Sequence, residues 1–416
     1  MSAHRWVKAY ERVLQLIPAY VQDARLTLCG LSTCVDAYVR LHEAKPLLNA
    51  RTGSPEAALA RELIRRAING VGGELYLNWP EGGRWVEQHL DIARWGVGGS
   101  GAQAAQTLAV IGAPALMSLQ DRGWRQLSVL HPDIRVATTA GVAKCGGLRP
   151  ADGMKPAHYI FEFTAGTQIG SAILKRSSRT IVRFGGEHLD DDPDFIRQSI
   201  SAAKDAGAGI LSGLNEIDDE SMNDALSQTI ELAQAWKECG LRHIHLEVGD
   251  YEAAEVRNRV LNLLSVKISS LGMSYSELCG ILPGEGDAVE KARELAEALD
   301  LRRLCVHSDT WALTVTRDDP FRELEALLFG SLLASTRAEK GVCALPVSLP
   351  DRAEFHELKW KSIQQSNERS VVSCPTPYLE RPAATIGLGD TFLAGTLLVL
   401  GGALRSNTTA TRVRSL

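Results

Sequence analysis

Secretory and membrane features are missing from this chain. Its eight cysteines form no CxxC pair, and several lie in apolar runs such as LCVH at Cys305 and GVCALP at Cys343. This usage predicts reduced, buried thiols rather than a disulfide framework. The N-terminus lacks a secretory hydrophobic segment. The longest uncharged apolar stretch, 391–404, is too short to span a bilayer and predicts a buried helix. We therefore expect a cytoplasmic protein without a membrane partner.

Basic charge is also scarce. The 416 residues include 45 Lys+Arg against 50 Asp+Glu, which gives a formal net charge of −5. Such a balance argues against a nucleic-acid partner, which needs a net basic surface. With 45% hydrophobic and 23% charged residues, the composition is that of a globular protein with a large core. The length predicts two or three domain-sized units.

Helices and strands are predicted to alternate from residue 195 onward. The helical patterns are FIRQSISAAKDAG, ALSQTIELAQAWKECG, YEAAEVRNRVLNLL and KARELAEALD, and the apolar strand patterns between and after them are GILSGL, HIHLEVG, VKISSLG and RLCVHSDTWALTV. This alternation predicts βαβ units, and therefore a mainly parallel sheet with helices on both faces. Near the N-terminus we expect a helix ending near Pro18, a short strand over 25–30 and a helical stretch through Arg40.

Segments with strand patterns and no long helices between them interrupt this alternation. GVGGELYLNWP at 70–80, HYIFEFTAG and SSRTIVRFGG predict strands without long helices between them. The predicted architecture is a large α/β domain over 1–35, 96–149 and 184–416, and a smaller β-rich domain over 36–95 and 150–183. The smaller domain is therefore discontinuous in sequence.

A first glycine cluster, GVGGSG at 96–101, precedes a predicted helix. It fits G-x-G-x-x-G, and Asp121 follows Gly101 by 20 residues, as in a dinucleotide-binding site. That fingerprint needs a buried strand immediately before it, whereas HLDIARW is interrupted by Asp91 and Arg94. Two other interpretations stay open. The glycines either form a turn for close helix–sheet packing, or Gly98 and Gly99 let the backbone approach a polyhydroxylated ligand.

A second glycine cluster, TIGLGDTFLAG at 385–395, is the sharpest signal. Gly387, Leu388 and Gly389 form a predicted tight turn, and Asp390 follows at the start of an apolar helix. Backbone N–H groups at a helix N-terminus bind anions. A carboxylate placed there can take a proton from a hydroxyl that attacks phosphorus. The alternative is that Asp390 only complements the helix dipole.

Other residues have functional and structural interpretations. His243 and His245 lie on one face of a predicted strand, but a zinc site would need a third His or Cys ligand nearby. Glu247 and Glu277 follow predicted strands and are either metal ligands or solvated carboxylates. Trp79 is either a carbohydrate platform or a packing residue.

The second glycine cluster resembles the G-x-G-D signature of the ribokinase-like sugar kinases. From about residue 25 onward the chain is similar to one branch of them, the ADP-dependent glucokinase and phosphofructokinase family. The matching blocks are GLSTCVDAY at 30–38, GVGGE at 70–74, Gly98–Gly99, HYIFEF at 158–163, TIVRFGG at 180–186, HLE at 245–247, SLGMSYSEL at 270–278 and HSDTWAL at 307–313. The resemblance implies a ribokinase-like α/β large domain with a mainly parallel central sheet and helices on both faces, and a smaller β-rich lid domain.

The resemblance also implies roles for individual residues. The implied substrate residues are Asp36, Glu74, Gly98 and Gly99, with Ser32 and Cys34 in the same pocket. The implied catalytic residues are Asp390 as general base, Gly387 and Gly389 through their N–H groups, and Arg183 facing the nucleotide phosphates. The implied nucleotide-binding residues are His307, Thr385, Gly387, Leu388 and Gly389. Glu247 and Glu277 are the implied ligands of Mg²⁺ or Mn²⁺. ADP is the implied phosphoryl donor, and ATP stays open as the alternative.

Three departures from the family pattern affect these expectations. Ser32 and Cys34 replace two asparagines of the sugar block, and Ser274 replaces another before Glu277. A serine or cysteine cannot reproduce the hydrogen bonds of an amide. We therefore expect a small sugar or polyol substrate other than glucose or fructose 6-phosphate, bound by a monomer or small homo-oligomer. The rival hypotheses are a non-catalytic sugar-binding or regulatory protein on the same fold and a dinucleotide-dependent oxidoreductase.

Overall fold

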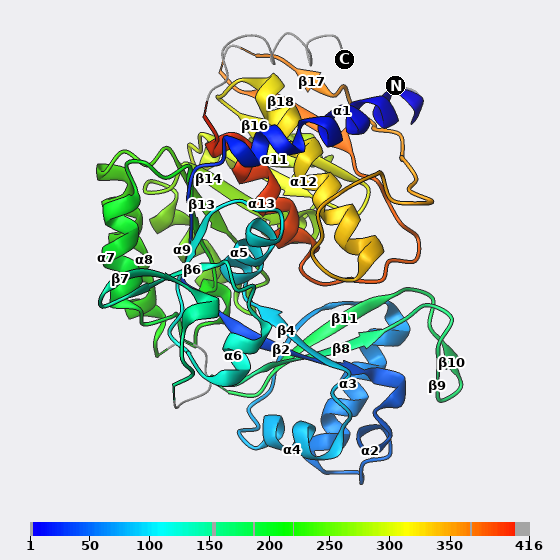
Figure 1. The fold of residues 1–416 in the computed structure, drawn as a ribbon. Helices are drawn as coiled ribbons and strands as arrows, with labels where there is room; N and C mark the ends of the chain where they lie inside the picture. The colour runs from blue at the N-terminus through cyan, green and yellow to red at the C-terminus, as the bar shows by residue number, and fades with distance from the viewer. Residues whose placement is uncertain (1–2, 152–154, 186–187, 219, 367, 404–416) are drawn as a thin grey trace.

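The computed structural model describes residues 3–151, 155–185, 188–218, 220–366 and 368–403. Two residues of the segments discussed above, Gly186 of TIVRFGG and Leu404 of the apolar stretch, lie outside this part of the chain. Figure 1 shows the rest as two lobes, with the larger one above the smaller.

An eleven-stranded sheet forms the centre of the larger lobe. Its strands, in spatial order, are β17 (Ile363–Gln364), β18 (Ser370–Pro375), β16 (Trp311–Thr316), β15 (Arg303–His307), β14 (Ser270–Ser274), β13 (His243–Glu247), β12 (Ala208–Leu211), β1 (Thr27–Cys29), β5 (Ala115–Met117), β6 (Arg135–Thr138) and β7 (Gly141–Lys144). From β15 to β6 all neighbours are parallel, and both edges are antiparallel. The predicted mainly parallel sheet is confirmed.

Helices cover both faces of this sheet, as predicted. One face packs on α1 (Ala3–Gln22), α5 (Ser100–Val110), α12 (Pro320–Lys340) and α13 (Leu388–Gly401). The other packs on α7 (Pro193–Ala202), α8 (Met222–Glu238), α9 (Ala254–Leu264), α10 (Tyr275–Ile281) and α11 (Ala288–Ala298). Helix α13 is buried from Thr391 to Gly401, which explains its uniformly apolar sequence. Among the helices that the structure describes, none has the length and apolar character needed to cross a bilayer.

The smaller lobe contains a five-stranded sheet. Its strands, in spatial order, are β3 (Gly73–Tyr76), β11 (Ser178–Arg183), β8 (His158–Phe163), β2 (Cys34–Arg40) and β4 (Arg94–Gly98). One face packs against the segment with α2 (Lys45–Leu48), α3 (Pro55–Asn69) and α4 (Gly82–His89), and the hairpin of β9 (Gln168–Ile169) and β10 (Ala172–Ile173) extends from one end. The remaining elements are α6 (Trp124–Val129), η1 (Leu41–Glu43), η2 (Cys145–Gly147) and η3 (Leu214–Glu216). The exact domain boundaries stay a prediction.

The other face of the small sheet contacts the large lobe beside the second glycine cluster. Tyr38, Ile160 and Ile181, from three neighbouring strands, form an apolar cluster with Ile386. Ile386 immediately precedes Gly387. The small sheet therefore lies directly over the N-terminal end of α13.

Two expectations about local structure were wrong. The segment before Arg40 is the strand β2 rather than a helix, because its residues are buried between β4 and β8 and pair with both. Helix α1 continues through Pro18 to Gln22. Ile17 and Tyr20, on either side of Pro18, are buried in the same core, so tertiary packing extends the helix.

Candidate active site

The second glycine cluster forms a left-handed turn that starts α13. Gly387 is the N-cap residue with φ 69°. A Cβ atom at this position would lie 2.3 Å from the Arg337 guanidinium, so only glycine fits. Arg337 Nη1 donates to Thr391 Oγ1 (3.0 Å), and Thr391 Oγ1 donates to the Gly387 carbonyl (2.7 Å). These bonds hold the turn, and Asp390 with it, in one conformation.

Asp390 lies between the N-termini of two helices. Helix α5 begins at Ser100, directly after Gly98 and Gly99, and Ser100 hydrogen-bonds to Asp390. Withdrawal from solvent raises the pKa of Asp390, and this effect outweighs the opposing hydrogen bond from Ser100. Both helix N-termini favour negative charge. The site combines a base of raised pKa with an environment suited to a phosphoryl group.

Ser32, Cys34 and Asp36 lie close to the first glycine cluster. Cys34 pairs with Gly98 across β2 and β4. A Cβ atom on Gly98 would lie 2.2 Å from Asp36 Oδ1, and one on Gly99, whose φ is 84°, would lie 2.5 Å from the Ser32 carbonyl oxygen. These glycines therefore allow their backbone to lie close to Ser32 and Asp36. Ser32 Oγ is buried and has no hydrogen-bond partner among the described residues, so it is available to a ligand.

The dinucleotide hypothesis does not fit this geometry. Strand β4 contains Gly96 and Gly98, and its first three residues are exposed or half-buried, so it is not the buried strand that the fingerprint needs. It is also antiparallel to β2 in the small sheet, so the glycines do not belong to a βαβ unit. Asp121 accepts hydrogen bonds from the backbone N–H groups of Gly123 and Lys155 (2.7 Å each). Its role is to hold two loops together.

Glu74 connects the two lobes. Its Oε2 atom forms an ion pair with Arg183 Nη2 (2.9 Å) within the small sheet. Its Oε1 atom accepts from Asn215 Nδ2 of the large lobe (3.1 Å). The structure thus places Arg183 beside Glu74. The sequence reasoning missed Asn215.

Arg179, four residues before Arg183 and on the same face of β11, was also missed. Its guanidinium is near three carboxylates, those of Asp309, Asp390 and Glu74. Burial lowers its pKa despite these charges, and Nε has no partner among the described residues. The spacing of Arg179 and Arg183 on an alternating strand was the available signal. Arg179 is the cation positioned for an anion next to Asp390.

The segments that carry Glu247, Glu277 and His307 meet at the carboxyl ends of β13, β14 and β15. His245 Nε2 lies 3.0 Å from Glu247 Oε2. A Cβ atom on Gly272 would lie 2.3 Å from that oxygen, so the glycine of SLGMS makes room for it. His307 Nε2 lies 3.8 Å from Glu247 Oε1, and a Cβ on Gly389 would be 3.1 Å from the same ring. The His307 ring therefore lies between Glu247 and the turn before Asp390.

Glu247 and Glu277 have the chemistry of a site for a hard divalent cation. Burial alone would raise the pKa of Glu247, but its contacts with His245 and His307 lower it to about 2. Burial and the charge of Glu247 raise the pKa of Glu277. A cation between the two carboxylates would relieve this like-charge repulsion, and carboxylate oxygens suit Mg²⁺. The residues therefore fit the metal that the sequence implied.

The remaining candidates occupy different places in the fold. His243 is buried, and among the described residues the only group of three closely spaced potential metal ligands is elsewhere, at Cys34, Asp36 and His158. Trp79 packs edge-on against Phe184 (5.4 Å between ring centroids) in the core of the small lobe. Thr385 is partly buried before the glycine turn, and Leu388 is the first residue of α13.

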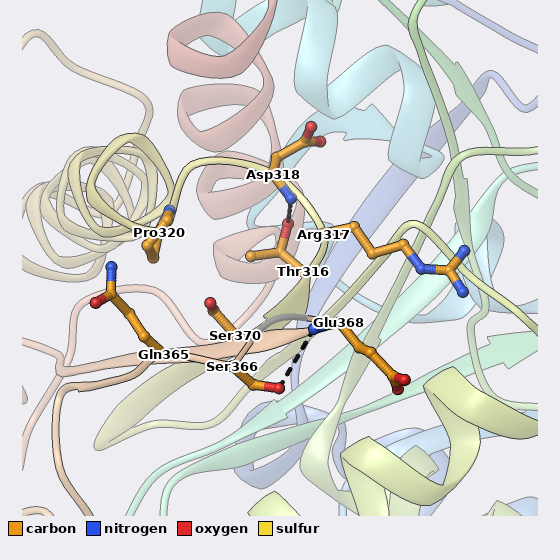
Figure 2. Close-up of a pocket in the computed structure, with 8 residues that line it drawn as sticks. All are labelled: Thr316, Arg317, Asp318, Pro320, Gln365, Ser366, Glu368 and Ser370. Atoms are coloured by element: carbon orange, nitrogen blue, oxygen red, sulfur yellow. Dashed lines mark hydrogen bonds between the residues drawn. The ribbon is translucent and has the colours of Figure 1, made fainter.

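A separate cavity of about 420 Å³ lies at the far edge of the large sheet (Figure 2). Its lining is mainly polar and consists of Thr316, Arg317, Asp318, Pro320, Gln365, Ser366, Glu368 and Ser370. None of the predicted site residues lines it. It therefore adds nothing to the candidate site.

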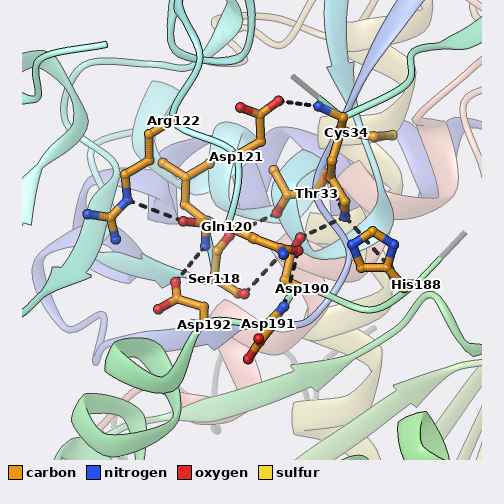
Figure 3. Close-up of polar contacts among 12 residues, drawn as sticks. Thr33, Cys34, Ser118, Gln120, Asp121, Arg122, His188, Asp190, Asp191 and Asp192 are labelled. Carbon is orange, nitrogen blue, oxygen red and sulfur yellow. Dashed lines mark hydrogen bonds and ion pairs between the residues drawn. The ribbon is translucent and has the colours of Figure 1, made fainter. Parts of the chain in front are cut away.

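The chain segments that cross between the lobes are joined by a polar cluster (Figure 3). Lys155 Nζ forms an ion pair with Asp190 Oδ1 (2.8 Å) and donates to the Thr33 carbonyl (3.3 Å). Ser118 Oγ donates to Asp190 Oδ2 (3.2 Å). Thr33 and Lys155 precede strands of the small sheet, and Asp190 follows the last of them. This cluster fixes the crossing between lobes.

Comparison with known proteins gives a consistent result. The ADP-specific phosphofructokinase/glucokinase conserved region matches residues 26–399. An ADP-specific phosphofructokinase of Pyrococcus furiosus is 29% identical over 281 residues, 58% of this chain and 62% of that relative. The aligned part therefore spans less than two thirds of its length. An ADP-dependent glucose/glucosamine kinase of the same organism is 23% identical over 93% of this chain and 96% of its own.

The fold is also shared with a solved structure. An ADP-dependent kinase in complex with fructose-6-phosphate and ADPβS superposes with a TM-score of 0.80 at 20% identity. The match covers 96% of this chain and 99% of the other. The two-lobe arrangement of this chain is therefore already known from a solved structure.

Proposed function

Because the chain belongs to the ADP-specific phosphofructokinase/glucokinase family, we propose that it is a sugar kinase that uses ADP. It transfers the terminal phosphoryl group of ADP to a hydroxyl of a sugar, sugar phosphate or polyol. The observation that carries this proposal is the position of Asp390. A partly buried carboxylate of raised pKa lies between two helix N-termini, over which the small sheet is packed.

In this mechanism Asp390 accepts the proton of the attacking hydroxyl on a carboxylate oxygen. The N–H groups at the start of α13 and the Arg179 guanidinium bind the developing charge on the phosphoryl oxygens. Glu247 and Glu277 would hold Mg²⁺, directly or through water, and the ion would neutralise charge on the nucleotide phosphates. Closure of the small lobe excludes water, which would otherwise compete as nucleophile.

The substrate binds between β2, β4 and Glu74. Asp36 and Glu74 accept hydrogen bonds from substrate hydroxyls, and Gly98 and Gly99 leave space for the substrate to approach the backbone. Ser32 Oγ contributes one further polar contact. Each buried hydroxyl left unpaired where an amide is missing costs about 1–3 kcal/mol. Two such losses change substrate preference by orders of magnitude.

A phosphorylation screen with ADP and ATP tests the proposal. The panel contains glucose, fructose 6-phosphate, shorter sugars, deoxy sugars, unusual ketoses and polyols, each assayed by steady-state kinetics with Mg²⁺. We expect turnover with ADP and the highest kcat/KM for a compound other than glucose or fructose 6-phosphate. If either of those two is the best substrate, the interpretation of Ser32 and Cys34 is wrong.

The altered sugar block also favours a second candidate, a non-catalytic sugar-binding protein on this fold. Calorimetric titration separates the two functions. Binding of panel compounds without turnover by either nucleotide would favour the binding protein. Turnover that requires Asp390 would exclude it.

A further inference from the structure

We propose that Cys34, Asp36 and His158 form a binding site for Zn²⁺, separate from the Glu247–Glu277 pair. All three side chains are less than 5% exposed. One potential ligand atom from each, the thiol sulfur, a carboxylate oxygen and a ring nitrogen, lies within 4.8 Å of the other two. No other triad of this kind occurs in the part of the chain that the structure describes.

The small sheet brings these residues together. Cys34 and Asp36 are two positions apart on β2, so their side chains share one face. Asp36 pairs in register with His158 on the neighbouring strand β8. On the opposite side, Gly98 has no side chain, and a Cβ there would lie 2.5 Å from Cys34 Sγ and 2.2 Å from Asp36 Oδ1. Strand β2 thus contributes two ligands and β8 contributes one. Strand β4 leaves space for them at Gly98.

The distances suit a small tetrahedral ion. With Zn–S of about 2.3 Å and Zn–N of about 2.0 Å, tetrahedral geometry separates sulfur and nitrogen by about 3.5 Å. Cys34 Sγ and His158 Nδ1 are 3.4 Å apart. Tyr38 OH donates to Asp36 Oδ2 (3.4 Å), as groups around a metal site orient its ligands. An ordinary hydrogen bond between thiol and imidazole is the competing explanation, and the experiment below distinguishes them.

The donor set determines which cation binds. A thiolate, an imidazole and a carboxylate favour a borderline-soft ion such as Zn²⁺, whereas Mg²⁺ requires oxygen ligands. Three protein ligands leave a fourth position open, as in zinc sites that exchange a water or a substrate atom. The chain therefore has two cation sites of different chemistry.

The zinc site overlaps the substrate pocket through Asp36. This consequence rests on the proposed function, because there Asp36 binds a substrate hydroxyl. Zn²⁺ bound at this site should compete with the sugar. Binding of the ion itself does not depend on kinase activity, so it is tested without nucleotide or sugar.

Cobalt titration of the full chain, followed by displacement with Zn²⁺, is the test. Tetrahedral Co²⁺ with a thiolate ligand gives visible bands and a sulfur-to-cobalt charge-transfer band. We expect one equivalent of Co²⁺ to produce this band and one equivalent of Zn²⁺ to remove it. In Cys34→Ser the charge-transfer band should disappear. The affinity for Zn²⁺ should fall at least about tenfold, since even outer-shell changes at metal sites cost this much. Cys239→Ser, at the end of α8, is the matched control and should retain both.

Each outcome decides the proposal. Absence of a thiolate band in the wild type, or its persistence in Cys34→Ser, overturns it. Thermal unfolding shows whether Cys34→Ser folds. If it does not, His158→Gln decides, because this variant retains the thiol. Its affinity for Zn²⁺ should also fall at least about tenfold if the ring nitrogen is a ligand, and unchanged affinity overturns the site. A chain that binds Zn²⁺ but phosphorylates nothing would refute only the proposed function.

Discussion

Asp390 is the residue on which the chemistry depends most. Asp390→Asn keeps the shape of the side chain but cannot accept the hydroxyl proton. We expect kcat to fall by about 10²–10⁴, the usual cost of removing a general base, while the KM for the sugar changes little. Stopped-time assays of product formation measure both. The control is Asp133→Asn on an exposed loop, where kcat should stay within about twofold of the wild type. Loss of less than about tenfold in Asp390→Asn would contradict the base assignment.

Substitutions of Arg179 and Arg183 should change different kinetic constants. Arg179→Gln removes a cation near Asp390, and we expect kcat to fall by about 10²–10³, as when one preorganised donor is lost. Arg183→Gln releases Glu74, so the main effect should be a higher KM for the sugar. Steady-state kinetics with the best panel substrate separates the two effects. A kcat within about threefold of the wild type for Arg179→Gln would rule out its contact with the phosphoryl group.

The sequence predicted those site residues whose positions depend on local spacing. The glycines before Asp390 and the pair Gly98–Gly99 were identified because turns and close approach require glycine in a short segment. Arg179 and Asn215 were missed because their roles come from contacts between the lobes. The triad of Cys34, Asp36 and His158 depends on strand register, which one sequence does not specify.

The start of α10 separates structural from metal-binding roles. Ser274 and Glu277 form a capping box, in which the Ser274 N–H donates to Glu277 Oε2 (2.7 Å) and the Glu277 N–H donates to Ser274 Oγ (3.2 Å). Glutamine also serves in such a box. We therefore expect Glu277→Gln to leave the free energy of unfolding nearly unchanged while raising the Mg²⁺ concentration for half-maximal activity. Ser274→Ala should instead lower the free energy of unfolding by about 0.5–2 kcal/mol.

Urea unfolding and Mg²⁺ titration measure the two effects at the start of α10. Unaltered Mg²⁺ dependence in Glu277→Gln would show that Glu277 is not a metal ligand. Full wild-type activity in excess chelator would remove the metal requirement itself.

At the scale of elements, long amphipathic helices and apolar strands were predicted and the first lid strand was not. Strand β2, Cys34–Arg40, is buried along nearly all its length, so its sequence lacks the alternation that marks a half-exposed strand. Its β structure comes from pairing with β4 and with the distant β8. Tertiary pairing decided what periodicity left ambiguous.

The whole molecule is held at the crossing between its lobes by Lys155 and Asp190. Burial raises the pKa of Asp190 to about 6, although Lys155, Thr33 and Ser118 oppose this. The folded protein thus holds this proton more tightly than the unfolded chain. The free energy of unfolding therefore decreases as pH rises from about 4 to about 6. Asp190→Asn lacks this titration.

The predicted result is a pH-dependent difference between wild type and Asp190→Asn. The free energy of unfolding of the wild type minus that of the variant should decrease by about 2 kcal/mol between pH 4 and pH 6. Urea denaturation at several pH values measures it. A difference that stays constant or increases with pH would contradict a raised pKa for Asp190.

The fold class of the whole molecule could be predicted, because alternating helices and strands leave few topologies. The strand patterns also predicted the smaller β-rich domain, and the resemblance implied that this domain is a lid. The packing of the small sheet on Ile386 and the polar cluster around Asp190 could not be predicted, since both join segments far apart in the chain.

Transfer of label from ADP tests whether this chain is a kinase that uses ADP and Asp390. ADP labelled in its terminal phosphate is incubated with Mg²⁺ and each panel compound, and AMP and labelled product are quantified together. We expect the wild type to form one labelled sugar phosphate for each AMP. The rate of transfer should be at least about 10²-fold lower in Asp390→Asn. No transfer from ADP to any compound, or equal transfer by Asp390→Asn, would contradict a kinase that uses ADP and Asp390.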